Sequence, residues 1–115
     1  MEKIDLTYLN QMSDGDKNLI IELTQIYKTQ IPEFINQLQQ AYNTKNWEKL
    51  AAIAHKAKSS VSIVGLNKLA TSLKTLELDA KKAINTENYQ NIITNFKETT
   101  LASINELEDA IKNKL

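Results

Sequence analysis

Hydrophobic residues recur every three or four positions along most of the chain, a spacing that places them on one face of a helix. The first long run follows a polar turn in which Ser13 and Asp16 approximate a capping box. Its apolar positions are Leu19, Leu23, Ile26, Tyr27, Ile31, Phe34, Ile35, Leu38 and Tyr42. The pattern predicts a helix that continues to about Tyr42. A kink is expected one turn before Pro32, which removes a backbone hydrogen bond.

Three more amphipathic runs follow, separated by short polar turns, and they predict helices over about 47–64, 66–83 and 87–113. Their apolar stripes are Trp47, Leu50, Ala54, Ala57, Val61 and Val64; Leu66, Leu69, Leu73, Leu76, Ala80 and Ala83; and Tyr89, Ile92, Ile93, Phe96, Ile104, Leu107 and Ile111. Residues 4–11 predict a short helix or arm that covers one end of the core. The expected fold is all-α, an antiparallel four-helix bundle in a single domain over residues 1–115.

Composition narrows the class of protein. The 115 residues suffice for one core, and 14 basic residues balance 14 acidic ones, which gives no reason to expect nucleic acid or a membrane surface as a partner. There is no cysteine, so disulfides and thiolate zinc sites are excluded. No apolar run approaches the roughly 20 residues of a membrane span, and no basic, apolar leader begins the chain. A cytoplasmic location is therefore expected.

The one histidine, His55, is the main candidate for chemistry. Each helical residue advances about 100°, which puts His55 roughly 140° from the centre of its core stripe and so toward solvent. Its neighbours at helical spacing are small or polar: Ala51, Ala52, Lys58, Ser59 and Ser62. The pattern predicts a flat, exposed surface that a second protein can reach.

An exposed, neutral imidazole has a lone pair that can attack phosphorus. Lys58 lies one turn on, where its ammonium can hold a phosphoryl oxygen, and the small Ser59 would let a partner's backbone approach. The same spacing also arises in helices where the histidine is incidental. No metal site is expected, because one histidine without cysteine or a suitably spaced carboxylate pair is a poor ligand set.

The segment from Ala54 to Gly65 resembles the signature of the histidine-containing phosphotransfer (HPt) domain family. It has a histidine, a lysine three residues on, small residues next, and a glycine ten residues after the histidine. The leucines at 69, 73 and 76, followed by Glu77, are similar to the family's next helix, and the likeness extends over about 6–113. Two positions depart from many members, which have glycine at Ser59 and a bulkier apolar residue at Ala57.

The resemblance implies a phosphorelay role. His55 would accept a phosphoryl group from a receiver-domain aspartate through the ring nitrogen remote from the backbone, and Lys58 would steady the group. Response-regulator receiver domains are the implied partners, with a hybrid sensor histidine kinase as a further candidate. The chain would be a covalent carrier rather than an enzyme, since it has no nucleotide-binding or kinase motif. It would need no cofactor of its own, with magnesium supplied by the receiver.

Several positions around the histidine helix have a functional and a structural interpretation. Docking to the partner is assigned to Ala51, Ala52, Ser59, Ser62 and Ile63, although Ile63 can equally be folded under the next helix. Gly65 is either a helix C-cap, the favoured interpretation, or a site of close approach. Lys81 and Lys82 are expected to be a solvated helix end, and Glu77 has no role beyond the helix surface or a contact between helices.

Two alternative functions remain open from the sequence. One is a non-catalytic helical interaction module in which His55 is incidental. The other is the phosphoacceptor module of a larger, chemotaxis-type histidine kinase.

Overall fold

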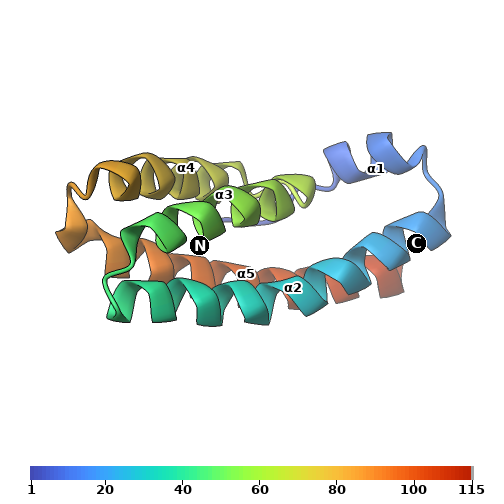
Figure 1. Ribbon diagram of the computed structural model, residues 1–115. Helices are drawn as coiled ribbons and strands as arrows, with labels where there is room; N and C mark the ends of the chain where they lie inside the picture. Colours follow the sequence, from blue (N-terminus) through green and yellow to red (C-terminus); the bar gives the residue numbers. More distant parts are fainter. Residues whose placement is uncertain (115) are drawn as a thin grey trace.

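Helices account for most of the chain, and successive long helices run in opposite directions (Figure 1). The computed structural model describes residues 1–114. The elements are α1 (Thr7–Ser13), α2 (Lys17–Asn43), α3 (Trp47–Ile63), α4 (Asn67–Lys82), the short 3-10 helix η1 (Thr86–Asn88) and α5 (Tyr89–Lys114). The predicted all-α bundle is confirmed. None of the helices within residues 1–114 combines the length and the hydropathy that a membrane span requires.

Side-chain caps fix where the long helices begin. The Asp16 carboxylate accepts hydrogen bonds from the backbone N–H groups of Asn18 and Leu19, so Asp16 is the N-cap of α2. The predicted capping box is therefore wrong, because Ser13 belongs to the last turn of α1 and is buried there. α3 begins in the same way, with the side chain of Asn46 accepting from the N–H of Lys49.

The buried face of α2 differs from the predicted stripe in its first half. Ile20 and Thr24 are buried there, whereas Ile26, which was expected in the core, is 47% exposed. The polar Thr24 is tolerated because its hydroxyl donates to the carbonyl oxygen of Ile20 at 2.9 Å, which leaves no unpaired polar atom. α2 runs through the exposed Pro32 without a break.

The hydrophobic core lies between the four long helices, and α3 and α4 pack most extensively against each other. α3 contributes the small side chains of Ala51, Ala54 and Ala57 to this core, so its backbone can approach its neighbours closely. α4 contributes Leu69, Leu73, Leu76 and Ala80, as its stripe predicted. Ala83, the last residue of that predicted stripe, is exposed instead, because it is the left-handed C-cap that ends α4.

The turn at Gly65 joins α3 to α4 and holds the N-terminal arm. The N–H of Leu66 donates to the carbonyl oxygen of Val61 and the N–H of Gly65 to that of Ser62, which is a Schellman C-cap. The arm passes directly over this turn, where the N–H of Asp5 donates to the carbonyl oxygen of Val64 at 3.0 Å. A side chain at Gly65 would collide with the backbone oxygen of Asp5. Both interpretations of Gly65 therefore apply, but the close approach is made by the chain's own arm.

The arm also caps α4, whose first residues lack a side-chain cap of their own. The Glu2 carboxylate accepts hydrogen bonds from the N–H groups of Lys68 and Leu69, at 2.8 and 2.9 Å. A carboxylate at a helix N-terminus is stabilised by the free N–H groups and the helix dipole. This contact fixes the N-terminal residues to the start of α4. The segment predicted to cover one end of the core, residues 4–11, packs against it through Ile4 and Leu6.

We expect Leu50→Ala to lower the free energy of unfolding by about 2–5 kcal/mol, because it leaves a cavity where a fully buried side chain packs. Urea unfolding followed by circular dichroism measures this loss. Leu78→Ala, at a 47% exposed position of α4, is the control and should cost far less. Equal losses in the two variants would contradict this assignment of the core.

Gly65→Ala should destabilise the fold more than Gly15→Ala, measured in the same way. Both glycines have positive φ, 80° at Gly65 and 73° at Gly15. An alanine in this left-handed conformation lowers the free energy of unfolding by about 1–2 kcal/mol in either variant. A methyl group at Gly65 must also displace Asp5, whereas one at Gly15 meets nothing within 4 Å. If the two variants lose equal stability, the arm does not depend on this contact.

Candidate functional site

His55 lies in the middle of α3 on its outer side, with 64% of the side chain exposed. The helical spacing placed it there, because its neighbours Ala54 and Ala57 occupy the core stripe. The ring therefore reaches solvent from a rigid helix rather than from a loop.

One ring nitrogen of His55 is occupied by a side chain from the next helix. Nδ1 lies 3.0 Å from Oε2 of Glu77, which comes from the middle of α4. The Glu77 side chain is only 9% exposed, so its carboxylate sits in the seam between α3 and α4. The extensive packing of these two helices brings together residues that are 22 positions apart in the sequence.

Two lysines complete the surroundings of the Glu77 carboxylate. Nζ of Lys81, one turn further along α4, lies 3.1 Å from Oε2, and Nζ of Lys58 on α3 lies 3.7 Å from Oε1. A buried carboxylate is costly unless it is paired, and these partners supply the pairing. Burial acts to raise the pKa of Glu77, but hydrogen bonds from Lys81 and His55 and the nearby positive charge outweigh it and hold the pKa below its usual value.

The ionised Glu77 determines which nitrogen of His55 is free. A carboxylate only accepts hydrogen bonds, so Nδ1 must carry the hydrogen that joins the two groups. In the neutral ring the lone pair is then on Nε2, the nitrogen remote from the backbone. The arrangement can present a fixed, nucleophilic nitrogen to a reactant that arrives from solvent.

His55 lies in a shallow depression between α3 and α4. Its lining combines small or apolar side chains with charged ones; the residues that form it are Trp47, Glu48, Ala51, Ala52, His55, Lys56, Glu77, Ala80, Lys81 and Ala83. Ala52 is exposed beside the ring, where it was expected. The prediction for Ala51 is wrong, because that side chain is 2% exposed and packs in the core.

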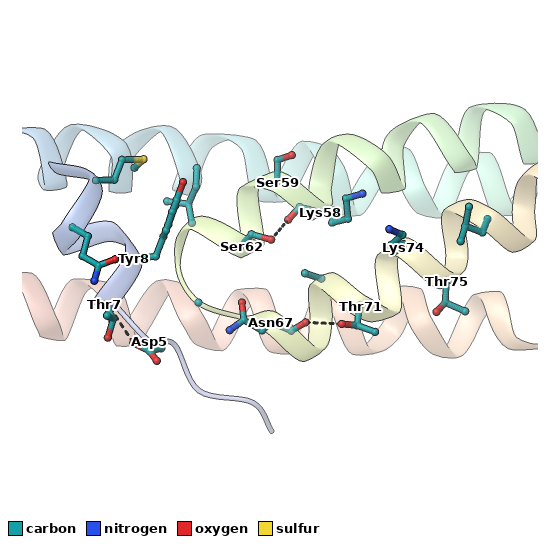
Figure 2. A pocket seen from close by; sticks show the side chains of 16 residues that line it. Asp5, Thr7, Tyr8, Lys58, Ser59, Ser62, Asn67, Thr71, Lys74 and Thr75 are labelled. Carbon is teal, nitrogen blue, oxygen red and sulfur yellow. Dashed lines mark hydrogen bonds between the residues drawn. The ribbon is translucent and has the colours of Figure 1, made fainter.

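A second groove lies further along the same face, between α1, α3 and α4 (Figure 2). The exposed Tyr8 and Met12 of α1 form one wall, and Lys58 and Lys74 extend into the space between α3 and α4. The remaining predicted docking residues line this groove rather than the depression around His55; they are Ser59, Ser62 and Ile63.

The three predicted docking residues in this groove differ in how far their side chains are exposed to a partner. Ser59 is exposed, whereas Ser62 and Ile63 are half-buried. The Ser62 hydroxyl already donates to the carbonyl oxygen of Lys58 at 2.8 Å. Gly65 is half-buried under Asp5 at the edge of this groove.

The sequence pattern indicated no chemical role for Glu77 or for Lys81, although a contact between helices was one of the two interpretations of Glu77, and its contact with His55 is of that kind. Lys81, expected to be a solvated helix end, makes an ion pair with Glu77 four residues earlier. That i,i+4 spacing is visible in the sequence. Glu77 also follows Leu73 by four residues and Leu76 by one, which places it at the edge of the stripe that faces α3. Its contact with His55 depends on how α3 and α4 are aligned, which the pattern of one helix does not determine.

Comparison with known families identifies the family to which the chain belongs. A family model described as the Hpt domain matches residues 22–113, most of the chain. Comparisons with curated proteins and with solved structures gave no significant match. Hpt domains are phosphocarrier modules of two-component signalling, and the family interacts with receiver domains and histidine kinases. The chain belongs to the Hpt domain family.

Proposed function

We propose that the chain carries a phosphoryl group on Nε2 of His55 and passes it between aspartates of receiver domains. The observation that supports this most is the exposed ring whose Nδ1 is held by the buried carboxylate of Glu77. This contact leaves Nε2 as the nitrogen with the lone pair, on the side of the ring that a partner can reach.

The proposed step is an in-line displacement on phosphorus. The Nε2 lone pair forms the N–P bond while the P–O bond to the donor aspartate breaks, and its electrons leave with the aspartate carboxylate. The ring keeps its hydrogen on Nδ1 and becomes a phosphorylated imidazolium. The negative charge of Glu77 at 3.0 Å stabilises this cation. Transfer to the next receiver is the same step in reverse.

The partner is proposed to dock along α3 and α4, over the depression around His55 and onto the groove beside α1. The depression is open to solvent and alanines are among its lining residues, so a receiver's active-site cleft can close over it. The adjoining groove offers exposed apolar side chains, Tyr8, Met12 and Leu78, for a neighbouring surface of the partner. The receiver would supply the magnesium that neutralises the phosphoryl group, and the chain itself would need no cofactor.

His55→Gln should abolish phosphorylation and change the free energy of unfolding by less than about 1 kcal/mol, because the side chain is mostly exposed and Lys58 and Lys81 still pair with the Glu77 carboxylate. The assay mixes the chain with receiver domains that carry labelled phosphoaspartate. It then maps acid-labile, base-stable label on wild type and variant. Urea unfolding of the same samples gives the stability.

Two results would contradict the proposal: no label on wild type from any phosphorylated receiver, or equal labelling of wild type and His55→Gln. Label that reaches His55 only from a histidine kinase and ATP, and never from a receiver, would instead favour the module of a larger kinase.

Glu77→Gln should alter how stability depends on pH. Because the folded chain holds the pKa of Glu77 below its usual value of 4.5, the ionised carboxylate contributes stability at pH values above 4.5. The contribution is lost as the pH falls through the lowered value. The difference in free energy of unfolding between wild type and Glu77→Gln should therefore shrink below pH 4.5, as measured by urea unfolding across this range. A difference that stays constant would mean that the carboxylate is not stabilised by its neighbours.

A further inference from the structure

We propose that Lys81, on α4, binds an oxygen of the phosphoryl group on His55. The inference rests on the proposed function, and it adds a cation from the second helix of the site to the one that family resemblance assigns to Lys58. Three observations lead to it: a shared carboxylate oxygen, the exposure of the two lysines, and the groove or depression that each one lines. The change in charge expected on phosphorylation points the same way.

Lys81 and His55 meet at the same atom. Nζ of Lys81 and Nδ1 of His55 lie 3.1 and 3.0 Å from Oε2 of Glu77. The ammonium is therefore one oxygen atom away from the ring that is proposed to carry the phosphoryl group. Lys58 is held by the other carboxylate oxygen, Oε1, at the longer distance of 3.7 Å.

The two lysines also differ in their freedom to move. The Lys81 side chain is 60% exposed and lines the depression that contains His55. The Lys58 side chain is 26% exposed and lines the other groove, where it extends toward α4 near Lys74 (Figure 2). A lysine ammonium on a flexible stem binds phosphate oxygens as a point charge. Of the two, Lys81 can reach a group on the outer side of the ring with less rearrangement.

Phosphorylation of His55 itself favours a movement of the Lys81 ammonium away from Glu77. Attack through Nε2 makes the ring cationic while Nδ1 keeps its hydrogen, so the ring pairs more strongly with Oε2 of Glu77. Lys81 then competes with a cation for one oxygen, and a phosphoryl group with two negative charges appears nearby. The ammonium is expected to leave Glu77 for the phosphoryl oxygen. The other charged groups that line the depression are Glu48 and Lys56.

The experiment labels the whole chain with phosphoramidate, which needs no docking partner. The Nε2 lone pair forms the new N–P bond, and ammonia leaves with the electrons of the old one. The variants are Lys81→Gln, Lys81→Arg and the matched control Lys82→Gln, which alters the adjacent exposed lysine outside the depression. Labelling rates and 31P spectra of the phosphorylated chain are measured across pH, and circular dichroism shows that each variant is folded.

The labelling rate of Lys81→Gln should fall about tenfold relative to wild type, the effect of one charge-assisted hydrogen bond. The 31P titration of the phosphoryl group should move to higher pH in that variant, because an adjacent cation favours the doubly charged form. Lys81→Arg should restore both values, and Lys82→Gln should leave both unchanged.

Equal rates and equal 31P titrations in Lys81→Gln and Lys82→Gln would overturn the inference. They would leave the proposed function intact, provided that His55 is labelled. A slower rate without a shift of the titration would also overturn it, since Lys81 would then act only through Glu77. If wild type takes no label at His55 from phosphoramidate or from any receiver, the proposed function fails and this inference fails with it.

Discussion

The buried carboxylate of Glu77 is the constraint on which the site depends. It is nearly covered by α3 and α4, and its charge is balanced by groups from both helices: His55 and Lys58 from one, Lys81 from the other. An unpaired charge at this depth would be costly, so these contacts are coupled to the packing of the two helices. The same carboxylate fixes the orientation of the imidazole and the position of its hydrogen. The exposed nitrogen is therefore set by a residue that solvent scarcely reaches.

The remainder of the fold keeps this pair of helices in place. Small residues on α3 allow α4 to pack closely, and leucines of α4 fill the space beneath the site. At the far end of α3, the Schellman turn at Gly65 lets the N-terminal arm cross the junction and cap α4 through Glu2. The arm leads into α1 (Figure 1). Residues of α1 form the outer wall of the groove next to the site. Stability and the proposed docking surface depend on the same short segment.

Much of the fold could be predicted from one sequence, because helical periodicity is a local property. It gave the four long helices, most of the core and the outward position of His55. It failed where the packing of neighbouring helices decides which side chains are buried. Thr24 lies in the core although the hydrophobic pattern did not select it, and its hydroxyl is satisfied there by the carbonyl oxygen of Ile20 in the same helix. Ala51 was placed on the surface because a helical wheel shows where a side chain points but not how near the next helix lies.

The site was predictable only in part for the same reason. The family resemblance and the helical wheel both selected His55 and Lys58, which lie on one helix one turn apart. Glu77 and Lys81 form an ordinary i,i+4 pair that is common on exposed helix faces. Their connection to His55 depends on the register between α3 and α4, a long-range property. The correct interpretation of Gly65 likewise required the path of the arm, which is distant in sequence.

The position of the imidazole hydrogen tests the central claim most directly. Long-range 15N–1H correlation spectra of the unphosphorylated chain, recorded where the ring is neutral, distinguish the two tautomers. The account predicts that Nδ1 of His55 carries the hydrogen and that Nε2 does not, and that Glu77→Gln weakens this preference. A ring that carries its hydrogen on Nε2 in the wild-type chain would contradict it, because the nitrogen facing solvent would then have no lone pair to attack phosphorus.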